Sequence, residues 1–341
     1  MRNKSLDAAK AVAACLVVCI HVSFPGQAGQ LIKVLARCAV PFFFMVSGYF
    51  CYYENENVEK KILFKILHIL KLFAASAVFY FIWECFMKVW DGESLWSWIK
   101  EIVSTVHLKE LLVYNSTSVV RAHLWFLPAL IYCYVTDFFI EKWRMRKAAY
   151  CCVPALFAML LWRAEFCALS DRFYHTMEYR NFLFTGMSFF LTGQMIREYQ
   201  DKITCKCQRK PMHQGICAGI ILGVVLSVVE YGFFGAGEIY AGNCIAVICL
   251  FLWIILYGKK INFPCVMTET GRKSAFLIYL LHPATADLLK KISELLKISD
   301  QQAYLWLRPA LVYLLTLLTI YCISVISSVY FKSVHRIRNM V

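Results

Sequence analysis

The sequence predicts an all-α membrane protein, a polytopic transmembrane bundle of about ten helices, and three observations support this prediction. The composition is strongly apolar, since 60% of the 341 residues are hydrophobic and only 17% are charged. The apolar residues fall in runs of roughly 18 to 25, the length that a helix needs to cross a hydrocarbon core about 30 Å thick. The cations gather in short loops between those runs. This composition excludes an ordinary soluble domain.

Each apolar run is interpreted as one membrane span. The predicted spans cover residues 6–24, 31–53, 62–86, 123–140, 148–164, 180–197, 214–232, 239–257, 274–291 and 304–330. Basic residues precede the first run as in a signal peptide, but no small-x-small cleavage motif follows His21, so we expect a retained helix. Because the sequence shows no internal repeat and no low-complexity tract, we expect one membrane domain over residues 1–341.

The placement of the cations predicts the orientation of the chain. Its 36 Lys and Arg exceed its 22 Asp and Glu, which gives a formal net charge of +14. The cations concentrate at the two ends and in alternate loops: Arg2, Lys4, Lys60, Lys61, Lys142, Arg144, Arg146, Lys147, Lys202, Lys206, Arg209, Lys210, Lys259, Lys260, Arg272, Lys273, Lys332, Arg336 and Arg338. The positive-inside rule therefore places both termini in the cytoplasm of a multi-pass plasma-membrane protein. The excess charge marks topology, so we expect the lipid bilayer, and no nucleic acid, as a partner.

One long outer connection, residues 87–122, interrupts this regular pattern. It carries Trp90, Trp96 and Trp98 among charged residues. The pattern is typical of an amphipathic helix lying at the membrane interface. An aromatic belt explains these tryptophans better than a role in substrate binding does.

The cysteines indicate neither a disulfide framework nor a metal site. Most of the 16 cysteines lie inside apolar runs, where the thiol behaves as a small hydrophobic group. Cys205 and Cys207 form a local pair, but the second cysteine pair that a structural zinc site needs is missing. We expect no metal and no bound cofactor.

Ionisable residues inside the first span are the first candidates for chemistry, because a buried polar group costs at least a few kcal/mol in a bilayer. Lys10 and His21 are eleven positions apart, which is about 1100 degrees of helical rotation, or three turns plus about 20 degrees. They therefore share a face and lie about 16 Å apart along the axis. Alanines between them allow a helix or a thin ligand chain to come close. A snorkelling Lys10 and a hydrogen-bonded His21 are equally good interpretations at this point.

Later spans add further polar residues. The second span contains Arg37, Pro41 and Ser47, and the proline frees the carbonyl of Arg37, so we expect a kink there. Others lie near the outer ends of spans or late in the chain: His123, Trp125, Arg180, Asn181, Tyr279 and His282. Asn181 could cap a helix instead of binding an acceptor. Glu165 and Glu230 lie at outer ends of spans, where a carboxylate at the membrane interface has a low free-energy cost, so a structural role is favoured for both.

The predicted topology brings several of these residues to the outer half of the bundle: His21, Arg37, His123, Arg180 and His282. Imidazoles and guanidiniums in one cavity suit general base catalysis on a hydroxyl and stabilisation of the oxyanion of acyl transfer. His21 is the preferred base, because an imidazole has a pKa of about 6.5 in water.

Several of these segments together resemble the integral-membrane acyltransferase family 3. The first-span pattern of a cation, ten intervening residues and His21 is similar to that family's signature. Arg37 with Val40–Tyr49 resembles its second-span motif, and Leu124–Leu127 resembles its fourth. Ser274–Pro283 is similar to its late span, so the resemblance covers about residues 5–330.

The resemblance implies an acyltransferase that moves an acyl group, preferably acetyl, from cytoplasmic acyl-CoA to a hydroxyl of a cell-envelope glycan or a related small acceptor. His21 is then the catalytic histidine. The expected donor-binding residues are Lys10, Asp7, Ser47, Arg272 and Lys273. The expected acceptor and oxyanion residues are Arg37, His123, Trp125, Arg180, Asn181, Tyr279 and His282. Lys10 stands where the family usually has Arg, and it loses the bidentate fork for phosphate.

Two alternatives remain open at the level of the sequence. The same polar residues would line the pathway of a transporter or exporter of a small polar substrate such as serine, because some domains of this kind are fused to serine racemases. Paired inverted repeats would favour this interpretation, and the sequence shows none. A non-catalytic membrane scaffold would instead have polar positions that do not converge.

Overall fold

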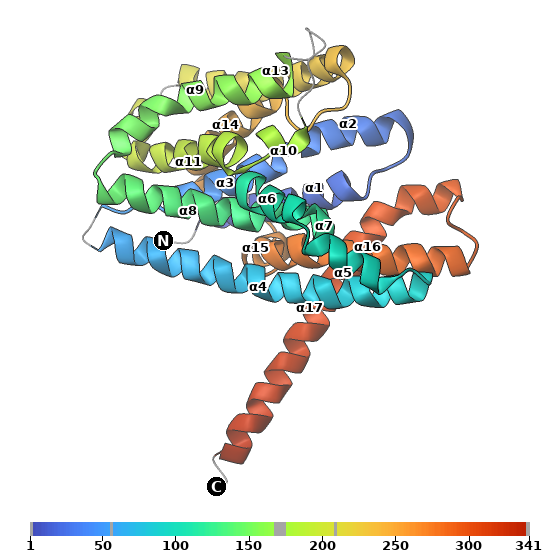
Figure 1. Ribbon diagram of the computed structural model, residues 1–341. Coiled ribbons are helices and arrows are strands. Elements are labelled where there is room, and N and C mark those ends of the chain that lie inside the picture. Colours follow the sequence, from blue (N-terminus) through green and yellow to red (C-terminus); the bar gives the residue numbers. More distant parts are fainter. Residues whose placement is uncertain (1–2, 55–56, 167–174, 208–209, 339–341) are drawn as a thin grey trace. The chain divides into compact units, whose positions relative to one another are not determined.

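The computed structural model describes residues 3–54, 57–166, 175–207 and 210–338. Every regular element in that part of the chain is a helix, which confirms the all-α fold class (Figure 1). The chain divides into two compact units, which are described separately: unit 1 contains Met1–Ala36 and Tyr257–Val341, and unit 2 contains Arg37–Leu256. One membrane domain over the whole chain stays a prediction.

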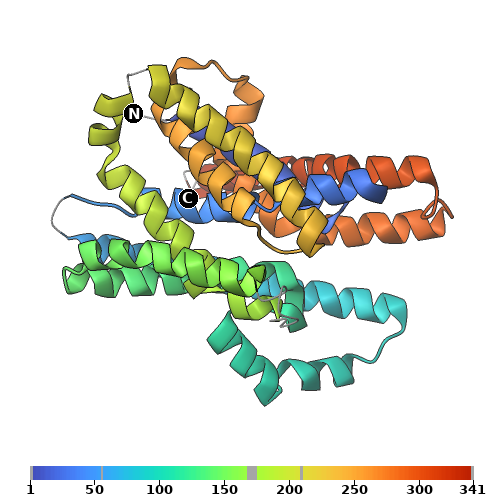
Figure 2. The same cartoon turned by 90° about the horizontal axis from the view of Figure 1, so that it is seen from above.

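Unit 1 is built around the first helix. Its elements are α1 (Lys4–His21), α2 (Gly26–Ala36), the 3-10 turn η4 (Gly258–Lys260), α15 (Cys265–Lys273), α16 (Ala275–Leu295) and α17 (Gln302–Arg338). Asn3 caps α1, because its side-chain oxygen accepts a hydrogen bond from the Leu6 amide at 3.1 Å. Helix α1 contacts α2, α15, α16 and α17, and α16 lies beside α17 (Figure 2).

Unit 2 contains the remaining helices. They are α3 (Ala39–Tyr49), α4 (Val58–Asp91), α5 (Leu95–Ile102), α6 (Thr105–Tyr114), α7 (Ser118–Arg121), η1 (Ala122–Trp125), α8 (Phe126–Lys142), α9 (Arg146–Ala164), α10 (Thr176–Tyr179), the π-helix η3 (Phe182–Met187), α11 (Ser188–Glu198), α12 (Gln200–Cys207), α13 (Lys210–Phe234) and α14 (Ala241–Leu256). Its main helix pairs are α13 with α14, α11 with α3, and α4 with α8.

Small residues allow the closest of these helix pairs. A Cβ added at Gly48 of α3 would lie 1.8 Å from the Phe190 carbonyl oxygen of α11. A Cβ added at Gly193 of α11 would in turn lie 2.0 Å from the Met45 carbonyl oxygen. Both positions therefore require glycine.

A buried carboxylate also joins α8 to its neighbours in unit 2. Asp137 of α8 is fully buried. It accepts hydrogen bonds from the Gln194 side-chain amide at 3.0 Å and from the Cys51 thiol at 3.2 Å. Because a buried charge or dipole needs partners, this network favours one arrangement of these helices.

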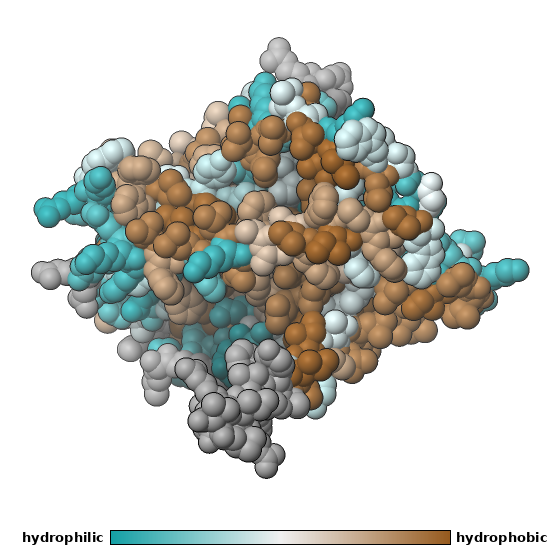
Figure 3. Space-filling view, turned by 60° about the horizontal axis from the view of Figure 1, so that its bottom comes forward, coloured by the Kyte–Doolittle hydropathy of each residue, from teal (hydrophilic) through white to brown (hydrophobic). Residues whose placement is uncertain are grey.

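The described helices carry the apolar surface that a membrane protein needs. Among them, 6 stretches are long and apolar enough to cross a membrane: Gly26–Tyr49, Val58–Asp91, Ser118–Lys142, Arg146–Ala164, Pro211–Phe234 and Gln302–Ser327. Helices α1, α11, α14 and α16 occupy the other predicted spans, so the number of crossings stays a prediction. Large apolar side chains are exposed on α4, α13 and α17, and broad apolar areas cover the face shown in Figure 3. Such surface is typical of contact with lipid.

Two local expectations need correction. The predicted second span, 31–53, is not one kinked helix, since α2 ends at Ala36 and α3 begins at Ala39. Pro41 lies in the first turn of α3, where its missing amide hydrogen does no harm, so the helix restarts there. The segment 87–122 is not one amphipathic helix either, because α4 runs on to Asp91 and three short helices follow. Helix α5 alone is amphipathic, with Trp98 buried and Trp96 exposed.

Candidate functional site

Two histidines meet in unit 1. His21 is exposed at the end of α1, and His282 is fully buried in α16. Their ring centroids are 5.2 Å apart, and the ring planes are inclined by 43°. The structure therefore brings together two of the predicted site residues that are 261 positions apart in the sequence.

The backbone of α16 fixes the tautomer of His282. Its Nδ1 atom lies 2.9 Å from the carbonyl oxygen of Ile278. A carbonyl oxygen can only accept a hydrogen bond, so Nδ1 carries a proton, and in the neutral ring Nε2 is an acceptor. Pro283 follows within the helix and leaves the carbonyl of buried Tyr279, four residues earlier, without its helical donor.

Charged residues gather at the opposite end of α1. The Lys10 ammonium lies 3.3 Å from the Asp7 carboxylate on the same helix. On α15, Arg272 and Lys273 pair with Glu269 at 2.6 Å and 3.1 Å. Both of these cations are well exposed, so their ion pairs with Glu269 can exchange for a polyanionic ligand at little expense.

Helix α15 lies directly against the start of α1. A Cβ added at Gly271 would lie 1.7 Å from the Asp7 carbonyl oxygen and 3.0 Å from the Ala11 amide nitrogen. This contact places the predicted donor-binding residues of the two helices at one end of unit 1. At the level of Asp7 and Ala11 a helix fills the small-residue face, which is one of the two occupants that the alanines allow.

In unit 2, one carboxylate joins two predicted guanidiniums. Glu238 Oε2 lies 2.7 Å from Arg37 and 3.3 Å from Arg180. The Arg180 guanidinium also lies over the Trp125 ring, 5.4 Å from its centroid. The Tyr240 hydroxyl donates to the Gly235 carbonyl at 2.7 Å and accepts from the Gly237 amide at 2.6 Å, which holds the loop that carries Glu238. We call Arg37, Glu238, Arg180 and Trp125 the guanidinium cluster.

The other predicted residues of unit 2 have structural partners. Buried His123 packs edge-on against Tyr80 at 4.9 Å between centroids. Asn181 caps η3, since its side-chain oxygen accepts from the Leu183 and Phe184 amides at 3.0 Å and 3.1 Å. The Ser47 hydroxyl donates to the Phe43 carbonyl of its own helix at 2.9 Å.

The sequence interpretation missed the acidic partners of these cations, Glu238 and Glu269. A signal for Glu238 was present, because a buried guanidinium such as that of Arg37 needs a carboxylate. Glu238 lies in the short connection just before the eighth predicted span, which makes it a candidate partner for Arg37. Glu269 lies three residues before Arg272, at the spacing of a helical ion pair.

Another acidic pair lies apart from the guanidinium cluster in unit 2. Glu165 follows the end of α9 and is almost completely buried, close to Glu230 of α13. Burial and the Glu230 carboxylate raise the pKa of Glu165 to about 8. Glu230 itself accepts a hydrogen bond from the Gly242 amide at 2.9 Å. In the part of the chain that the structure describes, no group of three or more potential metal ligands comes together here or elsewhere.

Within the described residues, helices with lipid-compatible surface carry paired imidazoles and exposed cations, and these features define a class of helical membrane protein with a polar site. Within this class the chain belongs to the acyltransferase domain family, whose sequence profile matches residues 3–329. This match confirms the family resemblance and the assignment as an enzyme that transfers acyl groups other than aminoacyl groups.

A further relative is more distant. The chain is 28% identical over 141 residues to a serine/alanine racemase of Enterococcus gallinarum. The match covers 38% of this chain and 18% of the racemase. The chain thus matches less than a fifth of that relative's length. No solved structure is significantly similar to this chain.

Proposed function

We propose that this membrane acyltransferase moves an acetyl group from cytoplasmic acetyl-CoA to a hydroxyl of a cell-envelope glycan or a related small acceptor, with His21 as the general base. The observation that carries the proposal is the pairing of an exposed imidazole, His21, with the buried His282 ring at 5.2 Å. The family supplies the reaction class. The donor, the acetyl group, the acceptor and the plasma-membrane location are parts of the proposal.

In the proposed reaction His21 accepts the proton of the acceptor hydroxyl. The oxygen then attacks the thioester carbonyl carbon, the carbon–sulfur bond breaks, and the proton passes from His21 to the departing thiolate of CoA. A positioned imidazole accelerates such a step about 10²–10⁴-fold, because an imidazole exchanges protons near neutral pH. His21→Ala should therefore reduce turnover by about a hundredfold or more.

His282 acts through His21 as a positioning residue. Because Nδ1 of His282 donates to the Ile278 carbonyl, its Nε2 atom is left as an acceptor. This acceptor favours an N–H on the His21 ring, and it stabilises the His21 imidazolium that forms when His21 takes up a proton. His282→Gln keeps an acceptor near the Nε2 position, while His282→Leu removes it. We expect His282→Leu to lower kcat and shift the acidic limb of the pH profile, and His282→Gln to restore much of both.

The cations at the other end of α1 are the proposed donor site. Lys10, Arg272 and Lys273 offer positive charge to the phosphates of CoA next to the contact between α1 and α15. Lys10→Gln should raise the KM for acetyl-CoA several-fold and leave kcat nearly unchanged, because a partly exposed charge contributes about 1 kcal/mol to binding. A fall in kcat at unchanged KM would contradict a role in donor binding.

The test uses purified full-length protein, radiolabelled acetyl-CoA and extracted envelope glycans. Released CoA is measured by mass spectrometry, because the 16 cysteines of the protein would react with thiol reagents. Label transfer that is lost in His21→Ala and retained in His68→Ala, a control at an exposed histidine of α4, supports the proposal. Mass spectrometry of envelope glycans from cells with and without the protein identifies the acceptor and the acyl group.

Transport is the second candidate, because the chain is partly similar to a protein named serine/alanine racemase. Under this alternative the protein would carry a small polar substrate such as serine across the membrane. Flux of labelled serine into vesicles without release of CoA would support transport and would contradict the acyltransferase proposal. The acceptor roles predicted from the sequence apply to either function and need the same assays; they concern Arg37, His123, Trp125, Arg180, Asn181 and Tyr279.

A further inference from the structure

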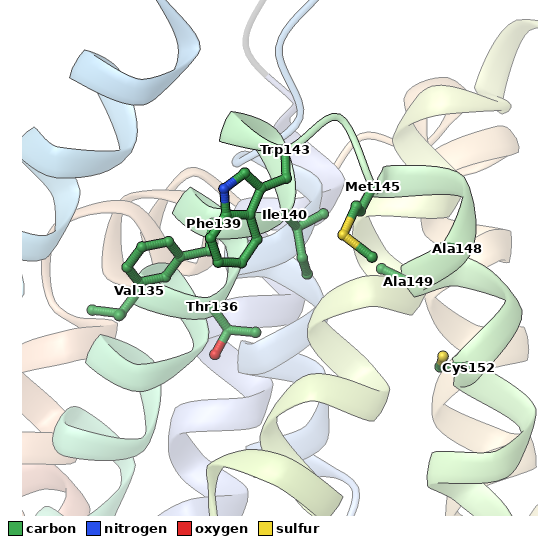
Figure 4. Close-up of a pocket in the computed structure, with 9 residues that line it drawn as sticks. All are labelled: Val135, Thr136, Phe139, Ile140, Trp143, Met145, Ala148, Ala149 and Cys152. Carbon is green, nitrogen blue, oxygen red and sulfur yellow. The ribbon is translucent and has the colours of Figure 1, made fainter.

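An open apolar groove runs between α8 and α9 in unit 2, starting at the turn that joins them. Its volume is about 410 Å³. Figure 4 shows its lining on the facing sides of the two helices, including Phe139, Ile140 and Trp143 from α8 and its end, and Met145, Ala149 and Cys152 from the turn and α9. Phe139, Trp143 and Met145 are 40%, 63% and 50% exposed, so the groove is open to the surroundings of the protein.

The two helices that form this groove are apolar along most of its length. Both helices belong to stretches long and apolar enough to cross a membrane, Ser118–Lys142 and Arg146–Ala164. The turn between them has room for few residues, and Arg144 adopts a left-handed conformation there, with φ of 56°. The groove therefore begins at the membrane surface, where the turn lies, and continues into the apolar layer.

Positive charge surrounds the surface end of the groove. Lys142, Arg144 and Lys147 are exposed around the turn, and none of the three forms an ion pair with another residue that the structure describes. The fourth cation, Arg146, is held by Glu141 through hydrogen bonds of 2.6 Å and 2.5 Å. Clusters of Lys and Arg next to a membrane span attract anionic headgroups.

We propose that this groove is a binding site for an anionic phospholipid, whose phosphate contacts Lys142, Arg144 and Lys147 and whose acyl chain lies along Phe139, Met145 and Ala149. The arrangement of an apolar channel beneath a cluster of uncompensated cations matches the two parts of such a lipid. The Trp143 indole, at the boundary between them, occupies the position that tryptophan favours at membrane interfaces. The site does not depend on the proposed reaction.

The test is photo-crosslinking in vesicles. Full-length protein is reconstituted in phosphatidylcholine that contains a trace of phosphatidylglycerol with a photoactivatable group in its acyl chain, and labelled peptides are mapped by mass spectrometry. We expect label within residues 135–152. We also expect the labelling to fall about threefold or more when unlabelled phosphatidylglycerol replaces part of the phosphatidylcholine, since each cation near the surface favours anionic lipid.

Two variants separate the headgroup from the chain. Lys142→Gln/Arg144→Asn/Lys147→Gln removes the charge, with Asn at position 144 because it tolerates a positive φ, and should abolish the preference for phosphatidylglycerol. Ala149→Leu fills the groove and should reduce labelling by the probe. The matched control Lys259→Gln/Lys260→Gln removes exposed cations of unit 1 and should change neither.

Three results would overturn the proposal. They are labelling that does not change when unlabelled phosphatidylglycerol replaces part of the phosphatidylcholine, labelling confined to peptides outside residues 135–152, and displacement of the probe by long-chain acyl-CoA at lower concentrations than by phosphatidylglycerol. The last result would assign the groove to the acyl donor.

Discussion

Protonation of Glu165 should affect the stability of the protein. Its pKa is raised from 4.5 to about 8, first by burial and second by the Glu230 carboxylate, while the Ala241 amide opposes the shift. A carboxyl group with a raised pKa in the folded state stabilises that state fully below its unfolded pKa, and this contribution is lost as the pH rises through the folded value. The melting temperature of the purified protein should therefore fall as the pH rises from 4.5 to about 8, and should change little at higher pH.

Glu165→Gln tests this assignment, because glutamine resembles the protonated carboxyl. The variant should melt at nearly the same temperature as the native protein at about pH 4, below the unfolded pKa, and at a higher temperature at about pH 8. The matched control is Glu54→Gln, which changes an exposed glutamate. A variant with the same pH dependence as the native protein would show that Glu165 is ionised in the fold.

Asn181 illustrates how a residue expected to bind an acceptor can have a structural role instead. Its side chain accepts two amide hydrogen bonds of η3 and donates to the Met177 and Glu178 carbonyls at 3.2 Å and 2.8 Å. Asn181→Ala should destabilise the fold by about 0.5–2 kcal/mol for the lost cap alone. Thermal unfolding measures this loss, and Asn181→Asp, which keeps the accepting oxygen, should lose less. An unchanged melting temperature with a raised KM for the acceptor would restore the binding role.

At the scale of elements, the contact of α1 with α15 depends on a single glycine. Gly271→Ala would place a Cβ 1.7 Å from the Asp7 carbonyl oxygen, so the two helices must separate. Overpacking of this kind costs about 1–3 kcal/mol, and the proposed donor site should be displaced with it. We expect a lower melting temperature and weaker binding of acetyl-CoA by calorimetry.

The control for this change is Gly215→Ala in α13, where a Cβ meets nothing within 4 Å. Alanine is favoured over glycine inside a helix, so that variant should be as stable as the native protein or slightly more stable. Equal stability of Gly271→Ala and Gly215→Ala would mean that α15 does not pack as closely on α1 as the structure indicates.

The sequence predicts the helices of this protein well because each depends mainly on its own apolar run. It predicts partnerships poorly, because these depend on tertiary contacts. Arg37 and Glu238 are 201 positions apart, and no periodicity links them. The break before α3 could have been anticipated from Pro41, yet hydropathy alone is continuous across it. The π-helical turn at Phe182–Met187 is set by the Asn181 cap and by Thr185, whose hydroxyl donates to the Tyr179 carbonyl at 2.8 Å.

At the scale of the whole molecule, the distribution of cations makes the orientation of every loop testable. The positive-inside rule places the loops near Asn57, Met145 and Lys260 on the cytoplasmic side, together with both termini, and the loops near Gly92, Gly237 and Ser299 on the outer side. Truncations at these positions, fused to alkaline phosphatase or to green fluorescent protein, report the side directly. Phosphatase should be active after Gly92, Gly237 and Ser299, and fluorescence should appear after the other positions.

The orientation also constrains the proposed reaction. In α1, Lys10 must then face the cytoplasmic supply of acyl-CoA, and His21, about 16 Å further along the axis, must face the outer side where envelope acceptors lie. A single helix would thus join the donor side to the acceptor side. Phosphatase activity after residue 57 or after residue 145, with fluorescence after Gly92, would show that the protein has the opposite orientation. His21 would then lie on the cytoplasmic side, and an acceptor in the cell envelope could not reach it.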